Sequence, residues 1–198
     1  MKTLYFLSAM LLLSTALNAQ SKLTDFRVSG GFGNPVAGFN FKNGTTLNMG
    51  GEGAVVFANN IFVGGFGMGT TSANNNMNKT STLSSISTLE HPNYHIESEY
   101  GGFWIGYIIR LNKRFYVNVS GKVGSGQVLL NNHDIQTTVY DKVSVIKPQL
   151  SVDVKLLSIL AITVGGGYTH FGNMSIKGYG AGNFNSSEFF AGIKMGWW

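Results

Sequence analysis

Apolar and polar residues alternate along eight segments of this chain, and clusters of turn-forming residues separate the segments. In one of them, Phe115, Val117 and Val119 share a face, while Asn118 and Ser120 share the other. A period of two residues predicts a β-strand with one apolar face. The predicted strands are Thr24–Gly33, Thr45–Ala58, Ile61–Thr71, Tyr94–Arg110, Phe115–Val128, Val139–Val154, Ile159–His170 and Ser187–Trp197.

The connections between these strands alternate in length. The tight ones are Asn59-Asn60, Leu111–Arg114 and Lys155–Ser158. Short turns on one side and long loops on the other are typical of bacterial outer-membrane barrels, in which the short turns face the periplasm. We therefore expect an all-β fold, an eight-stranded antiparallel transmembrane β-barrel in up-and-down meander order, with both mature ends on the periplasmic side. The longer connections are Asn34–Gly44, Ser72–Asn93, Leu129–Thr138 and Phe171–Ser186.

The alternation also predicts which side chains face lipid. Two segments break the phase, and we expect a β-bulge in each, at Gly101-Gly102 and at Lys147-Pro148, because glycine and proline in strands often mark bulges. The expected lipid-facing residues include Phe26, Val28, Gly30 and Phe32 in the first strand, Met49 and Val55 in the second, Ile162 and Val164 in the seventh, and Phe189, Ile193, Met195 and Trp197 in the last.

The amino terminus has the pattern of a secretory signal peptide. Lys2 supplies the positive charge, Leu4–Leu13 is the apolar stretch, and Ala16–Ala19 leads to a cleavage site before Gln20. The apolar stretch has about ten residues, whereas a spanning helix needs about 20. The expected organisation is a signal peptide over residues 1–19 and a barrel domain over residues 20–198. The sequence contains no cysteine, which excludes a lipoprotein anchor and a disulfide framework.

Composition favours a membrane wall over a soluble domain. Only 12% of the residues are charged, 13% are aromatic and 27 are glycines. A soluble β-sandwich or lipocalin-like barrel would also alternate, but it would usually place polar residues outside. The formal net charge is +5 and the basic residues form no run. Nucleic acid is therefore not an expected partner; contact with lipopolysaccharide phosphates and a simple scatter of solvated charge both remain open.

Charged residues on the polar face of the strands predict an ionic interior. An eight-stranded barrel is just wide enough inside for its own side chains, and buried charges must be paired. We expect a network of salt bridges that plugs the lumen; the alternative is a path for protons or ions. The predicted lumen charges are Arg27, Glu52, Glu97, Glu99, Lys122, Lys147, Asp153 and Lys194.

Two histidine-containing segments are candidate chemical sites. His91 and His95 flank Pro92, which argues against a metal-binding helix, so no metal and no cofactor are expected. The segment His170-Phe171-Gly172-Asn173 resembles the His-x-Ser-Asn motif of PagL-type lipid A deacylases, which are eight-stranded barrels with a Ser-His-acid site. His170 and Asn173 match that motif, but Gly172 stands in place of the serine. Ser175 is out of pattern, and Glu188 could act as the acid only by analogy.

Several longer segments are similar to small outer-membrane β-barrel proteins common in Bacteroidota. They are Tyr100–Gly102, Asn112–Gly121, Val145–Leu150 and Ala161–Tyr168. The architecture is also similar to the OmpA membrane domain and to OmpX. The resemblance implies an integral outer-membrane protein with no assigned activity. Its expected partners are outer-membrane lipid, lipopolysaccharide and, during insertion, the barrel assembly machinery, and it is expected to be a monomer.

The expected role is structural or in surface contact, without catalysis. The loop Ser72–Asn93 is rich in Ser, Thr and Asn and is a candidate contact surface or a flexible solvated segment. Trp197-Trp198 is expected to end the closing strand and to join the periplasmic aromatic girdle. A lipid A-modifying enzyme centred on His170 and a small-solute channel are the two alternative functions.

Overall fold

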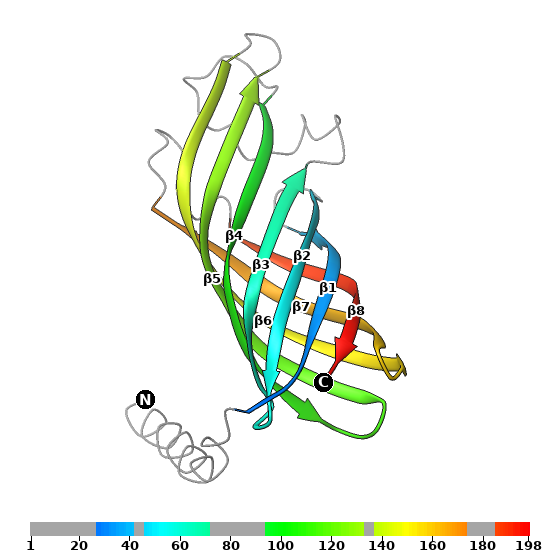
Figure 1. Cartoon of the computed structure of the whole chain (residues 1–198). Helices are drawn as coiled ribbons and strands as arrows, with labels where there is room; N and C mark the ends of the chain where they lie inside the picture. Colours follow the sequence, from blue (N-terminus) through cyan, green and yellow to red (C-terminus); the bar gives the residue numbers. More distant parts are fainter. Residues whose placement is uncertain (1–26, 42–45, 72–93, 133–136, 174–184) are drawn as a thin grey trace, which may run out of the picture.

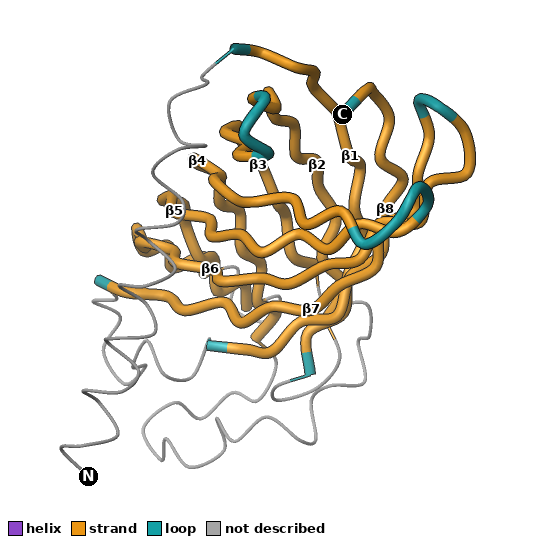
Figure 2. The backbone as a smooth tube through the Cα atoms, turned by 90° about the horizontal axis from the view of Figure 1, so that it is seen from below, coloured by secondary structure: helices purple, strands orange, loops and turns teal. Residues whose placement is uncertain are grey.

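The computed structural model describes eight antiparallel strands that close into one barrel (Figures 1 and 2). It covers residues 27–41, 46–71, 94–132, 137–173 and 185–198; the predicted signal peptide and the loop Ser72–Asn93 lie outside these ranges. The described residues contain no helix long and apolar enough to cross a membrane. The strands are β1 (Val28–Asn40), β2 (Thr46–Phe57), β3 (Ile61–Thr71), β4 (Tyr94–Arg110), β5 (Phe115–Asn132), β6 (Thr137–Leu157), β7 (Leu160–Gly172) and β8 (Ser186–Trp197).

Each strand pairs with its neighbours in the chain, and β1 pairs with β8 to close the sheet. Closure gives every strand two partners, so the barrel has no open edge at its centre. Asn112 shapes the β4–β5 turn, because its side-chain oxygen accepts hydrogen bonds from the backbone N–H groups of Arg114 (2.8 Å) and Phe115 (2.9 Å). The predicted fold class, an eight-stranded antiparallel meander, is confirmed.

Strand length differs around the barrel. β4, β5 and β6 rise beyond the other strands at the top of Figure 1. The sequence pattern underestimated several strands: β1 continues from the predicted end at Gly33 to Asn40, and β5 continues from Val128 to Asn132. Much of two predicted long loops is therefore strand. Asparagine and glycine in these stretches are typical of turns, but the ladder to the neighbouring strands continues through them.

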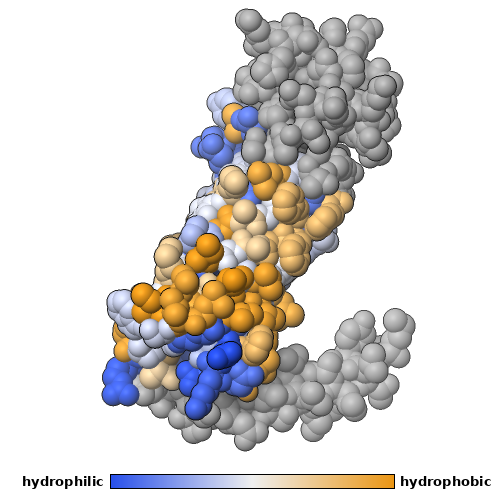
Figure 3. Space-filling model, turned by 90° about the vertical axis from the view of Figure 1, so that its right-hand side faces the viewer, coloured by the Kyte–Doolittle hydropathy of each residue, from blue (hydrophilic) through white to orange (hydrophobic). Residues whose placement is uncertain are grey.

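Exposed apolar side chains form a belt around the outside of the barrel. Figure 3 shows part of this belt as a broad orange region between the grey atoms at the top and a blue region near the bottom. Exposure of so many apolar side chains to water would be unfavourable. In a bilayer the same side chains contact the acyl chains of the lipids. The belt includes Met49, Val55, Phe103, Ile105, Val119, Val123, Ile146, Leu150, Ile162, Phe189, Ile193, Met195 and Trp197, all more than 40% exposed.

The prediction for the first strand is wrong beyond its first residues. Val28 is exposed as expected, but Gly30 and Phe32 are buried in the interior. The register between β1 and β2 shifts between Val28 and Gly30, and a shift by one residue moves every following side chain to the opposite face. Phe32 therefore packs inside the barrel. Phe26 lies outside the described residues.

Both predicted bulges are also absent. The pairing of β4 with β3 and β5 keeps one register through Gly101-Gly102. On β6, the pairs Ile146–His170 and Gln149–Gly167 have the same register on either side of Lys147-Pro148. The apparent change of phase arises because the interior is itself apolar at these levels: Trp104, Val143 and Val145 are 3% exposed or less and point inward.

Glycines on the inner face let the sheet coil tightly. A Cβ at Gly64 would lie 1.8 Å from the backbone oxygen of Gly53, and one at Gly126 would lie 2.0 Å from that of Glu99. On the outer face of the same wall, a Cβ at Gly67 would have no atom of a more distant residue within 4 Å. The inner glycines are therefore needed for close approach of adjacent strands, whereas the outer ones are not constrained in this way.

We expect Gly64→Ala to destabilise the barrel by about 1–3 kcal/mol, since an overpacked interior forces the backbone to shift. Gly67→Ala on the same strand is the matched control and should have little effect. The measurement is the urea midpoint of the folded barrel in detergent micelles. Equal midpoints for the two variants would show that the inner glycine is not needed for packing.

Candidate functional site: an ionic lumen

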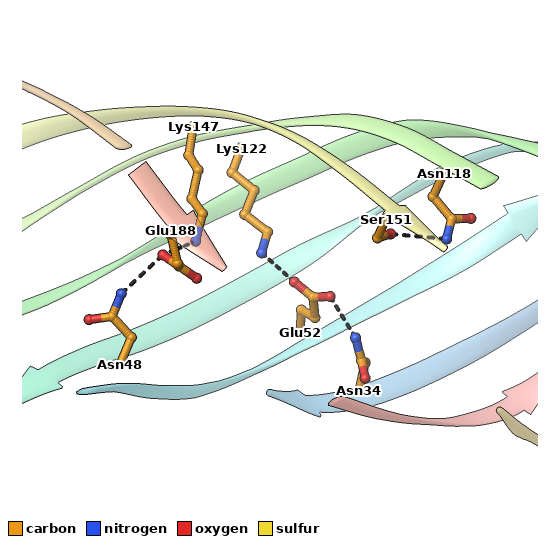
Figure 4. A network of polar contacts seen from close by, with 8 residues as sticks. All are labelled: Asn34, Asn48, Glu52, Asn118, Lys122, Lys147, Ser151 and Glu188. Carbon is orange, nitrogen blue, oxygen red and sulfur yellow. Dashed lines mark hydrogen bonds and ion pairs between the residues drawn. The ribbon is translucent and has the colours of Figure 1, made fainter. Parts of the chain in front are cut away.

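Within the described part of the chain, three ion pairs lie inside the barrel, and each joins a lysine to a carboxylate on another strand. The pairs are Lys122 with Glu52, Lys147 with Glu188, and Lys194 with Asp153. All six charged side chains are at most 2% exposed. Figure 4 shows the first two pairs, whose lysines project from β5 and β6 toward carboxylates of β2 and β8.

The first pair crosses the lumen from β5 to β2. Glu52 also accepts a hydrogen bond from Nδ2 of Asn34, at 2.7 Å. The Lys122 ammonium lies over the rings of Trp104 and Phe66, with Nζ 5.1 and 5.3 Å from the ring centroids. Two aromatic faces and one carboxylate thus stabilise the cation, and the carboxylate has a second donor from β1.

The second pair joins β6 to β8. Nζ of Lys147 lies 2.6 Å from Oε2 of Glu188, which also accepts a hydrogen bond from Asn48 at 3.0 Å. A glycine on β1 leaves room for the carboxylate, because a Cβ at Gly38 would lie 2.9 Å from Oε1 of Glu188.

The third pair lies toward the turn end of the barrel, near the last residues of β6 and β8. Asp153 pairs with Lys194 and accepts a second hydrogen bond from Oγ1 of Thr163, at 2.7 Å. Nζ of Lys194 lies 4.3 Å from the ring centroid of Phe32 and 5.6 Å from that of Trp198. Each of the three lysines is thus held between a carboxylate and at least one aromatic ring.

Aromatic side chains pack on both sides of the first two ion pairs, Lys122–Glu52 and Lys147–Glu188. On the turn side, Phe32 lies edge-on to Phe62, Trp104 and Trp198, with ring centroids 5.6–5.7 Å apart. On the loop side, Tyr100 lies edge-on to Phe171 at 5.7 Å. Such edge-to-face contacts are favourable. The rings also exclude water from the charges, which makes the pairing of each charge more important.

The three lysines are buried, so each ammonium needs a partner of opposite charge. Removing an ammonium or a carboxylate from water costs several kcal/mol even in a real protein interior. An opposite charge in contact, with further hydrogen bonds to the carboxylate, offsets that cost. Such a lumen can exclude solvent and fix strands of the barrel to one another.

Five of the eight predicted lumen charges meet in these pairs, and three do not. Glu99 is exposed on the outer face of β4, and Glu97 is half-buried on the same face. Arg27 is exposed and precedes β1. The expected bulge at Gly101-Gly102 had reversed the phase of the β4 glutamates, and without it they point outward.

Glu188 was missed as a lumen residue, although its position could have been found. It has the same parity as Lys194 on β8, and the alternation of that strand puts both inside. The resemblance to the deacylase motif instead suggests Glu188 as an acid partner for His170. That role is not supported, because Glu188 is 4% exposed in the lumen and bound to Lys147.

His170 lies on the exposed face of β7, and its neighbour is an amide. Nδ1 of His170 is 2.9 Å from Nδ2 of Asn185, whose Oδ1 accepts a hydrogen bond from the backbone of Phe171 at 2.8 Å. Asn173 has a left-handed backbone, with φ of 59°. Ser175, His91 and His95 lie outside the described residues. Among the residues that the structure covers, no group of three or more His, Cys, Asp or Glu side chains could hold a metal ion.

Trp197 and Trp198 have different surroundings. Trp197 is 67% exposed on the outer face, as expected for the girdle. Trp198 instead packs against Phe32 inside the barrel, with ring centroids 5.7 Å apart. The expectation that both residues join the girdle is therefore wrong for Trp198, because consecutive residues of an extended chain point to opposite faces.

No protein-family model matches the sequence, and no curated protein matches it. Solved structures do match its fold. Neisserial surface protein A (NspA) gives a TM-score of 0.56 with 8% identity, over 84% of this chain and 95% of that one. The N-terminal barrel domain of Pseudomonas aeruginosa OprF gives 0.55 with 7% identity, over 86% and 98%.

Ail, the attachment invasion locus protein of Yersinia pestis, gives a TM-score of 0.52 with 9% identity, over 86% of this chain and 99% of that one. That structure holds the heparin analogue sucrose octasulfate. At such low identity these matches establish the fold alone. The chain has the fold of eight-stranded outer-membrane β-barrels.

We expect Glu52→Ala to lower the free energy of unfolding by about 3–5 kcal/mol, because it leaves the buried Lys122 ammonium without a carboxylate. Glu99→Ala, which removes an exposed carboxylate, is the control and should have little effect. The measurement is the urea midpoint for the barrel in lipid or detergent. An unchanged midpoint for Glu52→Ala would mean that water reaches Lys122.

Proposed function

We propose that this protein is a non-enzymatic, integral outer-membrane barrel with a closed lumen, which reinforces the envelope and presents its loop end for surface contact. The observation that carries the proposal is the set of three solvent-excluded ion pairs across a lumen flanked by aromatic rings. A barrel filled in this way can act through its two ends and its outer wall, but not through a pore.

The outer wall supports the assignment to a membrane. Its exposed apolar belt would be unfavourable in water, and closure of the sheet satisfies the backbone groups that lipid cannot. The short turns between β2 and β3, β4 and β5, and β6 and β7 lie together at one end. In barrels of this kind the short turns face the periplasm. The loop-side ends of β4, β5 and β6 would then lie outside the cell.

The long strands β4, β5 and β6 support a role in contact. They continue beyond the belt with outward polar residues, among them Glu99, Gln127 and Lys142, all of which are exposed. Nε2 of Gln127 lies 3.5 Å from Oε2 of Glu99. A three-stranded extension of this kind is a rigid support for recognition by the loops that it carries. The structural similarity to Ail, an attachment protein by name, fits such a role.

A lipid A deacylase has weaker support. Nucleophilic catalysis needs an activated nucleophile and a base that a third group orients. Gly172 occupies the place of the nucleophile, and the group in contact with His170 is the Asn185 amide rather than a carboxylate.

We expect a peptide tag inserted at Asn75 to bind antibody on intact cells, and a tag at Asn59-Asn60 to bind only after the outer membrane is permeabilised. The physical reason is that the short turns face the periplasm. Flow cytometry measures both, and boiling-dependent migration on gels confirms that each tagged barrel is folded. Labelling of the Asn59-Asn60 tag on intact cells would reverse the orientation.

Lipid A mass spectrometry tests the absence of catalysis. Expression of the protein should leave the lipid A acyl chains unchanged, and His170→Ala should give the same spectrum. The reason is that position 172, where the deacylase motif has its nucleophilic serine, is a glycine. Loss of an acyl chain only when His170 is present would establish an enzyme.

A further inference from the structure

Four basic residues that are scattered in the sequence come together at the turn end of the barrel. Arg110 ends β4, Lys113 and Arg114 lie in the β4–β5 turn, and Lys155 lies near the end of β6. The backbone N–H of Lys155 donates a hydrogen bond to the oxygen of Arg114 at 2.8 Å, which joins the two turns. We call these four residues the turn-end basic cluster.

Aromatic rings hold two members of the cluster in place. The Arg110 guanidinium carbon lies 5.4 Å from the ring centroid of Tyr116, and Nζ of Lys155 lies 5.9 Å from the same ring. Nζ of Lys155 also lies 5.1 Å from the ring of Trp198. Contacts with the faces of aromatic rings stabilise these cations without neutralising their charge.

No described acidic side chain balances the turn-end basic cluster. The nearest is Asp153, which is opposite Tyr116 in the β5–β6 ladder, and its charge is matched by Lys194. Glu97, Glu99 and Asp141 lie toward the opposite end of β4 and β6. Among the described side chains, the turn end of β4, β5 and β6 therefore carries four positive charges, counting each basic side chain as one.

The same turns also expose apolar side chains. Leu111 and Leu156 lie on the outer face of the wall, whereas their neighbours Arg110 and Lys155 lie on the inner face, toward Tyr116. Leu111 is 63% exposed, Leu156 54%, Leu157 61% and Ile159 59%. Figure 3 shows a hydrophilic region near the lower end of the described barrel, directly below the apolar belt. Lysine and arginine beside exposed leucine and isoleucine are typical of surfaces that lie at the boundary between lipid headgroups and acyl chains.

We propose that the turn-end basic cluster attracts an anionic phospholipid of the adjoining leaflet. Lys113 and Arg114, both exposed in the turn, bind its phosphate group, Arg110 and Lys155 add positive potential from the inner face, and Leu111 and Leu156 contact its acyl chains. The charge excess matches an anionic headgroup, and the flanking apolar side chains match a lipid better than a free phosphate ion. The inference rests on the proposed function, because it requires the turn end to lie at a phospholipid leaflet.

The experiment uses native mass spectrometry of the full-length mature protein released from nanodiscs of phosphatidylcholine and phosphatidylglycerol. Gel migration with and without boiling is measured first, and a wild-type protein that never folds into a heat-modifiable barrel would overturn the proposed function itself. A folded barrel should retain phosphatidylglycerol in preference to phosphatidylcholine. Each basic residue near an anionic lipid surface strengthens binding by about fivefold.

The test variant is Arg110→Gln, Arg114→Gln and Lys155→Gln combined, and we expect it to lose the preference for phosphatidylglycerol by about tenfold or more. Lys113 is exposed in the β4–β5 turn, so Lys113→Gln should lose part of the preference with the barrel intact. The matched loop-side control combines Lys142→Gln on β6 with Lys79→Gln and Lys177→Gln, which belong to the β3–β4 and β7–β8 connections and lie outside the described residues. It should keep the preference.

Two results would overturn the inference. The first is equal retention of phosphatidylglycerol by wild type, the test variant and Lys113→Gln, all folded. The second is equal loss in the loop-side control, which would mean that net charge alone attracts the lipid. A further arm titrates inorganic phosphate into the barrel in neutral detergent. Stabilisation there equal to that by phosphatidylglycerol would assign the cluster to free phosphate instead.

Discussion

Closure of the sheet is the constraint on which the rest of this structure depends. Lipid offers no hydrogen-bond partner to a backbone N–H or C=O group, so each strand must pair on both edges. The pairing of β1 with β8 achieves this with eight strands, and eight strands leave an interior that side chains fill. The narrow lumen follows from closure, and the chemistry of the lumen follows from its width.

The charged side chains inside such a barrel need both a partner and enough space. Lys122, Lys147 and Lys194 enter the lumen from three different strands, and each pairs with a carboxylate on a strand that is not adjacent to its own. Gly38 leaves room for the carboxylate of the second pair. The aromatic rings then cover the cations and close the two sides of the ionic layer.

Much of the wall could be predicted from alternation, whereas the partners inside could not. The outward residues of β5, β7 and β8 agree with the pattern, because a single apolar face against lipid leaves a clear period of two. The phase of β1 was lost at the register shift after Val28, which depends on pairing with β2. Trp104 and Val145 looked like breaks in phase because the pattern does not reveal that the interior is apolar at their levels. The pairing of Lys147 with Glu188 depends on the register of β6, β7 and β8. The spacing of residues in the sequence does not predict that register.

The central claim is that the ionic lumen is closed, and single-channel recording in a planar bilayer tests it most directly. Wild-type protein, reconstituted as the folded barrel, should give no steady conductance, because Lys122, Lys147 and Lys194 lie out of reach of solvent in paired contacts. The recording should be repeated with Glu52→Ala, whose unpaired Lys122 loosens the packing. A stable, ohmic conductance from the folded wild-type barrel would contradict the account and would identify the protein as a channel.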